Sequence, residues 1–140
     1  MNFLGALLLS LELALVSCNF PQKNGTGPTV QILTGHTFSV QSLAVLSDKN
    51  LVSGSYDNTI RIWNTTTGQT ISILNGHTYG VTSVAIVLND TLASGSIDET
   101  IRIWNIINGQ TINIIKGFPN AVIALAALPG KQLIKNSVIK

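Results

Sequence analysis

The stretch SGSYDNTIRIWN at residues 53–64 returns as SGSIDETIRIWN at residues 94–105. The two copies lie 41 positions apart, and the same spacing separates His36 from His77. A period of this size indicates that one supersecondary unit has been duplicated. Such a unit does not bury both of its faces by itself, so the copies are expected to stack on one another.

Each copy of the unit predicts four short strands separated by turn residues. One further short strand is predicted at 30–33, before the first copy. Four closely spaced strands favour an antiparallel meander. The strands are expected at 40–46, 51–55, 59–63 and 70–74 in the first copy, and at 81–88, 92–96, 100–104 and 111–115 in the second.

The turns between these strands have local mechanisms. Asn108-Gly109 lies between two apolar strands and predicts a two-residue hairpin with positive φ, and Gly68 holds the same place in the first copy. Asp57-Asn58 and Asp98-Glu99 also lie between consecutive strands, where an aspartate bonds its own backbone. The strand at 81–87 is apolar on both faces apart from its Thr and Ser, which predicts cover from neighbouring sheets on both sides.

The composition describes an apolar, ordered chain. Of the 140 residues, 45% are hydrophobic and 10% are charged, well below the roughly 25% charged residues of typical soluble domains. Eight basic and six acidic residues are scattered singly, so no basic patch favours a nucleic-acid partner. The single cysteine, Cys18, excludes an intramolecular disulfide and a cysteine-based zinc site.

The N-terminal part does not share the repeat. Residues 1–18 form a hydrophobic segment with the length of a signal-peptide core, and the residues before Cys18 resemble a lipoprotein box. No Lys or Arg precedes the segment and Glu12 interrupts it, so a short buried helix is the alternative. Residues 19–28 are rich in Gly, Pro and Asn and predict a linker to a repeat region at 29–140.

A third copy begins and then degenerates over residues 117–140. Gly117 matches Gly76, but Phe118 stands where a histidine is expected, and Ile139 stands where an aspartate is expected. The repeat region is therefore expected to hold units at about 35–75 and 76–116, followed by the degenerate one.

The Gly-His pair followed by Ser-Gly-Ser-x-Asp-x-Thr-Ile-Arg-Ile-Trp resembles the WD-repeat family, although Asn64 and Asn105 replace the usual Asp after Trp. The resemblance implies an all-β fold of four-stranded antiparallel β-propeller blades. About two and a half blades would form an incomplete ring, because propellers have roughly 4–8. It also implies that the strand near 29–33 is the outer strand of a preceding blade.

The resemblance further implies one structural hydrogen-bond network in each blade. A buried imidazole, carboxylate and indole each need a partner, and they satisfy one another there. Ser55 and Ser96 are rival choices for the hydroxyl. The two networks are His36, Ser53, Asp57 and Trp63, and His77, Ser94, Asp98 and Trp104.

A Ser-His-Asp set also invites a catalytic-triad interpretation, but the repetition argues against it. An active site needs one asymmetric constellation, whereas these residues recur once per unit. The sequence contains no nucleophile elbow, phosphate-binding loop or metalloprotease helix motif. We therefore expect no catalytic residues, no cofactor and no metal site.

Four residues are candidates for partner contact. Family resemblance places the residues after Gly-His, and those before the network aspartates, near one face of the propeller. Aromatic side chains at such a surface anchor protein partners, whereas packing of loop side chains on the blade is the alternative. These residues are Phe38, Tyr56, Tyr79 and Ile97. Arg61 and Arg102 are expected to brace adjacent blades or to extend to solvent.

The sequence thus predicts a non-enzymatic scaffold for protein–protein interaction, either as part of a larger propeller or as a partner in one. The open blade faces are expected to be covered by self-association or by additional blades. The alternative is a secreted or membrane-anchored WD-repeat binding module delivered by residues 1–18. Family resemblance favours the cytoplasm, and a membrane role depends on that segment acting as an anchor.

Overall fold

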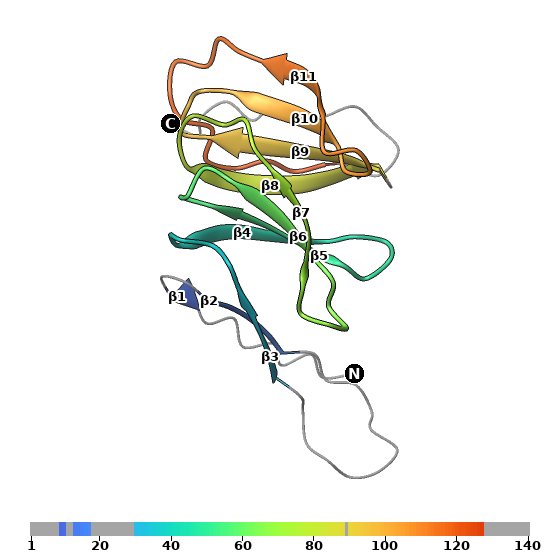
Figure 1. The fold of residues 1–140 in the computed structure, drawn as a ribbon. Coiled ribbons are helices and arrows are strands. Elements are labelled where there is room, and N and C mark those ends of the chain that lie inside the picture. Colours follow the sequence, from blue (N-terminus) through green and yellow to red (C-terminus); the bar gives the residue numbers. More distant parts are fainter. Residues whose placement is uncertain (1–8, 11–12, 18–29, 89, 128–140) are drawn as a thin grey trace, which may run out of the picture.

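The computed structural model describes residues 9–10, 13–17, 30–88 and 90–127. Their strands form three separate antiparallel sheets, which lie one above another in Figure 1. The first sheet has the order β1-β2-β3, with β1 at Leu9–Ser10, β2 at Leu13–Ser17 and β3 at Val30–Thr34. No helix long and apolar enough to cross a bilayer occurs among these described residues.

The two complete sheets correspond to the two sequence copies. We call the sheet in the order β4-β5-β6-β7 blade 1, and the sheet of β8 to β11, with the same internal order, blade 2. The all-β prediction with four strands in each blade is confirmed. The bounds are Val40–Val45, Leu51–Ser55, Ile60–Trp63 and Thr70–Leu74 for β4 to β7, and Val81–Leu88, Thr91–Ser96, Ile101–Asn105 and Thr111–Ile115 for β8 to β11.

The main core lies between the two blades. One face of blade 1 presents Val52, Ile60 and Leu74, and the facing side of blade 2 presents Leu92 and Trp104. All five side chains are buried, as expected for apolar strands that are covered by a neighbouring sheet. The stacking of copies, rather than any single sheet, therefore provides the core.

Two smaller cores flank the main one. Leu33 of β3 packs with Leu51 and Trp63 on the other face of blade 1. Val122 packs with Ala93 and Ile101 on the far face of blade 2. Both blades are thus covered on both faces, at least in part.

The connection between β10 and β11 differs from the two-residue hairpin that Asn108-Gly109 predicts. Asn105 N–H donates to the Gln110 carbonyl and Gly109 N–H donates to the Asn105 carbonyl, so the loop contains four residues, 106–109. The Asn105 side chain accepts hydrogen bonds from Ile107 N–H and Asn108 N–H. It therefore starts the turn earlier, and only Gly109 in this loop has a positive φ, of 72°.

A short helix was one of the alternatives predicted for the N-terminal segment, and the structure differs from it. Its described residues form strands, and β2 pairs with β3 in a register that joins Leu13 to Thr34 and Ser17 to Val30. β3 is therefore not an unpaired outer strand. The cleavage or lipidation of residues 1–18 stays a prediction, and Cys18 and the linker at 19–28 lie outside the described residues.

The degenerate third copy is described only as far as residue 127. Residues 117–127 contain an isolated bridge at Ala126 and no regular strand. Even so, Val122 N–H donates to the Ser96 carbonyl, and Leu125 N–H donates to Ser83 Oγ. This segment is therefore held against blade 2. Ile139 lies outside the described residues.

Candidate functional site

The buried polar residues of blade 1 form one continuous chain of hydrogen bonds. Trp63 Nε1–H donates to Ser53 Oγ at 2.8 Å, and Ser53 Oγ lies 2.7 Å from His36 Nε2. His36 Nδ1 lies 2.7 Å from Asp57 Oδ2. An ionised Asp57 carboxylate only accepts, so the imidazole proton lies on Nδ1, and Nε2 accepts from the Ser53 O–H.

The Asp57 carboxylate is the acceptor at the end of this chain. Its Oδ1 accepts from Thr59 Oγ1 at 2.6 Å and from Thr59 N–H at 2.9 Å, and its Oδ2 accepts from Thr37 N–H at 3.1 Å. These bonds tie the loop before β4 to the turn between β5 and β6. Asp57 therefore fixes two connections at the same end of the blade.

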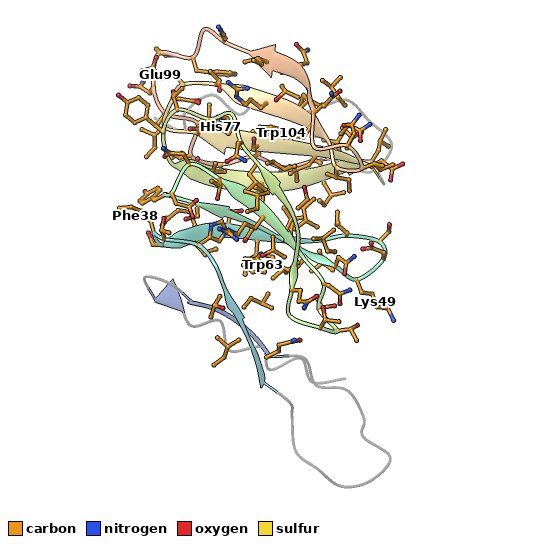
Figure 2. The ribbon with its side chains drawn as sticks, in the orientation of Figure 1. Phe38, Lys49, Trp63, His77, Glu99 and Trp104 are labelled. Carbon is orange, nitrogen blue, oxygen red and sulfur yellow. The ribbon has the colours of Figure 1, made fainter. Side chains whose placement is uncertain are left out.

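Blade 2 repeats the arrangement with nearly the same distances. Trp104 donates to Ser94 Oγ at 2.7 Å, Ser94 Oγ lies 2.7 Å from His77 Nε2, and His77 Nδ1 lies 2.8 Å from Asp98 Oδ2. Figure 2 shows His77 and Trp104 within this blade, with Trp63 in the blade below. The structure thus brings together all eight residues of the two expected networks.

The rival serines have a different set of partners. Ser55 Oγ donates to the Phe38 carbonyl and accepts from Asp57 N–H. Ser96 Oγ does the same with the Tyr79 carbonyl and Asp98 N–H. Both serines are fully buried, so each blade has two inward hydroxyl groups with separate roles.

The electrostatics of the networks follow from burial. Desolvation holds the pKa of His36 and His77 below the ordinary value of 6.5, although the neighbouring carboxylates act to raise it. Burial acts to raise the pKa of Asp57, but hydrogen bonds from Thr59, His36 and Thr37 outweigh it and lower that pKa below 3.8. A neutral imidazole that donates to a carboxylate is therefore the form that the fold favours.

Arg61 lies on the same face as the blade 1 network. Its guanidinium carbon is 5.7 Å from the centre of the Trp63 ring, a cation–π distance, and Arg102 lies 5.8 Å from Trp104 in blade 2. Arg61 Nη1 is also close to Gly35, where an added Cβ would lie 2.6 Å away. The arginines therefore pack over the tryptophans of their own blades, and their guanidinium groups reach Gly35 and Gly76, which follow the last strand of the preceding sheet.

The loops that carry the network histidines and aspartates lie at one end of the two blades. This end also has a set of exposed apolar side chains, which we call the loop-end cluster. Phe38 is 56% exposed and Tyr79 is 62% exposed, and each follows a network histidine by two positions. Tyr56 of blade 1 packs on Gly80 of blade 2, beside Tyr79. Figure 2 places Phe38 and Glu99 at this end and Lys49 at the opposite one. The cluster consists of Phe38, Tyr56, Tyr79 and Ile97.

A groove that no sequence motif indicated lies at the opposite end of the two blades. Its lining includes Asp48 of blade 1, Asp90 and Ile107 of blade 2, and Ile71. The groove has a cavity volume of about 250 Å³. Asp48 in this lining accepts hydrogen bonds from the Asn50 backbone N–H and from the Asn50 side chain. No cluster of three or more metal-ligating side chains occurs in the described ranges.

Comparison with known proteins identifies the repeat. The model of the family described as WD40, WD domain, G-beta repeat, matches residues 27–64 and 68–105, more than half of the chain. Solved chains described as "Crystal structure of RRP9 WD40 repeats" and "Structure of U3-55K" both superpose with a TM-score of 0.67 at 23% identity. They cover 91% of this chain, which spans 43% and 44% of theirs.

Two curated relatives match a shorter region. They are ribosome biogenesis protein YTM1 from Candida glabrata and from Vanderwaltozyma polyspora, each 49% identical over 39 residues. The match covers 28% of this chain and spans only 8% and 9% of those proteins. The similarity therefore extends over about one repeat unit.

Proposed function

Because this chain belongs to the WD40 family of WD-domain, G-beta repeats, we propose that it is a non-enzymatic scaffold that binds other proteins through its loop-end cluster. The observation that carries this proposal is the exposure of four apolar side chains at one end of two stacked blades. Large exposed apolar groups that gather in one place favour a protein partner. The scattered charges offer no comparable surface to nucleic acid.

The backbone that carries the cluster is held rigidly. The Ser55 hydroxyl holds the Phe38 carbonyl, and the Ser96 hydroxyl holds the Tyr79 carbonyl. Tyr56 N–H donates to the Ser39 carbonyl. A surface fixed in this way loses little conformational entropy on binding, which favours affinity. In this proposal the polar networks act indirectly, because they position the loops that contact the partner.

The triad-like geometry supports a structural role. Ser53 Oγ and Ser94 Oγ have the serine–histidine spacing of a nucleophile and its base. However, both serines are 0% exposed, and each hydroxyl accepts a hydrogen bond from an indole N–H. A substrate has no path to these oxygens in the folded state. The same group that resembles a nucleophile thus anchors a tryptophan.

The curated relatives are named for ribosome biogenesis, and the shared repeat supports participation in a multiprotein assembly. We propose a protein partner on that basis and from the chemistry of the loop-end cluster. The aromatic rings suit an apolar anchor on the partner, and the tyrosine hydroxyls suit polar groups around it.

The experiment that tests this function compares partner capture by matched variants. Phe38→Ala combined with Tyr79→Ala removes two exposed rings and is expected to leave the melting temperature nearly unchanged. Proteins retained by the wild-type chain in native extracts should be lost with this variant, with affinity reduced at least about tenfold for two anchor residues. The control is Ile107→Ala, at the opposite end. Equal retention by both variants would contradict the proposal.

A further inference from the structure

The groove between the two blades opens at the end opposite the loop-end cluster, where Figure 2 labels Lys49. Leu46 and Ile62 form its floor, and both are buried members of the main core. Ile71 and Ile107 lie at its rim, where they are 53% and 76% exposed. The groove therefore leads from solvent to the apolar core between the blades, and its position does not depend on what lies beyond either end of the stack.

The walls of the groove are held by hydrogen bonds of their own loops. Ile106 N–H donates to the Asp90 carbonyl at 3.0 Å, which joins the loop between β10 and β11 to the turn between β8 and β9. Leu46 N–H donates to the Asn50 carbonyl at 2.9 Å and closes the loop between β4 and β5. A site that is already formed in the free protein loses little conformational entropy when it is occupied.

Two carboxylates, one from each blade, also line this groove. Asp48 accepts its hydrogen bonds from Asn50, and both Asp48 and Asp90 are exposed. No described lysine or arginine, the adjacent Lys49 included, lies within ion-pair distance of either carboxylate. The groove therefore combines an aliphatic interior with negative charge that the described residues do not neutralise.

The size and the chemistry of the groove select its occupant. Its volume of about 250 Å³ is below the roughly 300–1,000 Å³ of clefts for drug-sized ligands, so it suits one long side chain. Arginine and lysine have an aliphatic stem that packs on apolar surface and a cationic head that stays at its edge. The isoleucines match such a stem, and the two carboxylates match the head. We propose that the groove is a second docking site, which takes one arginine or lysine side chain of a partner protein.

The test uses pentylguanidinium, which has the stem and the cation of arginine, and pentylammonium, which represents lysine. NMR of the isoleucine methyl groups in the full chain follows their binding. We expect saturable shifts at Ile71 and Ile107, and none at Ile97 in the loop-end cluster. The guanidinium ion, which lacks the stem, should bind at least about tenfold more weakly. Pentanol, which lacks the cation, should bind about fivefold more weakly.

Matched variants locate the two parts of the site. Asp48→Asn combined with Asp90→Asn should weaken the binding of pentylguanidinium about fivefold and leave that of pentanol unchanged. Glu99→Gln removes an exposed carboxylate at the opposite end and should change neither. Ile71→Ala should weaken the binding of both compounds. Ile112→Ala, at the same repeat position in blade 2 and outside the lining, should not.

Three results would overturn this proposal. They are the absence of saturable shifts with either cation, pentanol binding as tight as that of the cations, and equal losses in the double aspartate variant and in Glu99→Gln. If the cations bind as expected, the tighter of the two identifies the side chain as arginine or lysine. The loop-end cluster shares no residue with the groove, so failure of this test leaves partner capture through that cluster unaffected.

Discussion

The hydroxyl of Ser53 joins two buried aromatic side chains, those of Trp63 and His36. It accepts from Trp63 and donates to His36, and its own side chain is fully buried. Ser53→Ala would leave the indole N–H and one imidazole nitrogen unsatisfied. Each buried unsatisfied group costs about 1–3 kcal/mol, so we expect the free energy of unfolding to fall by roughly 2–6 kcal/mol.

Urea unfolding followed by tryptophan fluorescence measures this change. Ser39→Ala is the matched control, because the Ser39 hydroxyl accepts an exposed hydrogen bond from Gln41. Substitutions of that kind usually change stability by less than about 0.5 kcal/mol. If Ser53→Ala and Ser39→Ala had equal small effects, the network would not stabilise the blade.

The networks also predict a loss of stability in acid. Burial lowers the pKa of His36 and His77 in the folded state, so the unfolded chain binds protons first as the pH falls. The contribution of the neutral histidines to the free energy of unfolding is fully present above the unfolded pKa of about 6.5. It is lost as the pH falls from there towards the lower folded pKa. Asp57 and Asp98 act in the same direction at lower pH, because their folded pKa lies below 3.8.

The measurement is the urea midpoint at about pH 7.5 and about pH 5, on either side of the ordinary histidine pKa. We expect a lower midpoint at pH 5. His36→Asn combined with His77→Asn removes both titrating groups and should flatten this dependence, whatever its effect on stability itself. A wild-type midpoint that rises towards pH 5 would show that the histidines are protonated in the folded state.

At the scale of the strand, the approach of the two blades depends on Gly54. An added Cβ there would lie 2.7 Å from Val81 Cγ1 and 3.0 Å from Val84 Cγ1, on the facing blade. Gly54→Ala should therefore destabilise the protein by about 1–3 kcal/mol through overpacking. Combining it with Val81→Ala should recover part of that loss, and a double-mutant cycle in urea measures the coupling. Strict additivity would mean that the two residues do not compete for space.

The turns after β5 and β9 have the same backbone conformation but carry different residues at one equivalent position, so the two residue types can be exchanged between the repeats. Asn58 and Glu99 occupy equivalent positions with φ of 70° and 62°. Asparagine tolerates this left-handed conformation better than glutamate does. Glu99→Asn should increase the free energy of unfolding by up to about 1 kcal/mol, and Asn58→Glu should decrease it by a similar amount. Thermal unfolding would show the two changes as a higher and a lower melting temperature. Shifts of the same sign would rule out backbone conformation as the cause.

The repeat was sufficient to predict strand positions, because each strand is short and bounded by turn residues. It did not distinguish Ser53 from Ser55, since residues two apart lie on the same face of a strand and both are buried. It also misjudged the loop at 106–109, where the Asn105 side chain, rather than Asn108-Gly109, starts the turn. The pairing of β2 with β3 is a contact across 13 or more positions, which local patterns do not report.

For the molecule as a whole, stability should decrease from the middle of the stack towards its ends. In stacked repeats each unit is stabilised by the units on either side of it. Segments at the ends of the stack are covered on one side only, so they open more easily. The strands β5 and β9 are almost entirely buried, whereas β11 and the segment at 117–127 are largely exposed. Opening at the ends should therefore require less free energy than opening of β5 and β9.

Hydrogen exchange followed by mass spectrometry resolves this order. β3 and residues 117–127 should exchange much faster than β5 and β9, because less of their surface is covered. Equal exchange rates at the ends and in the two central strands would show that the stack opens as a single unit.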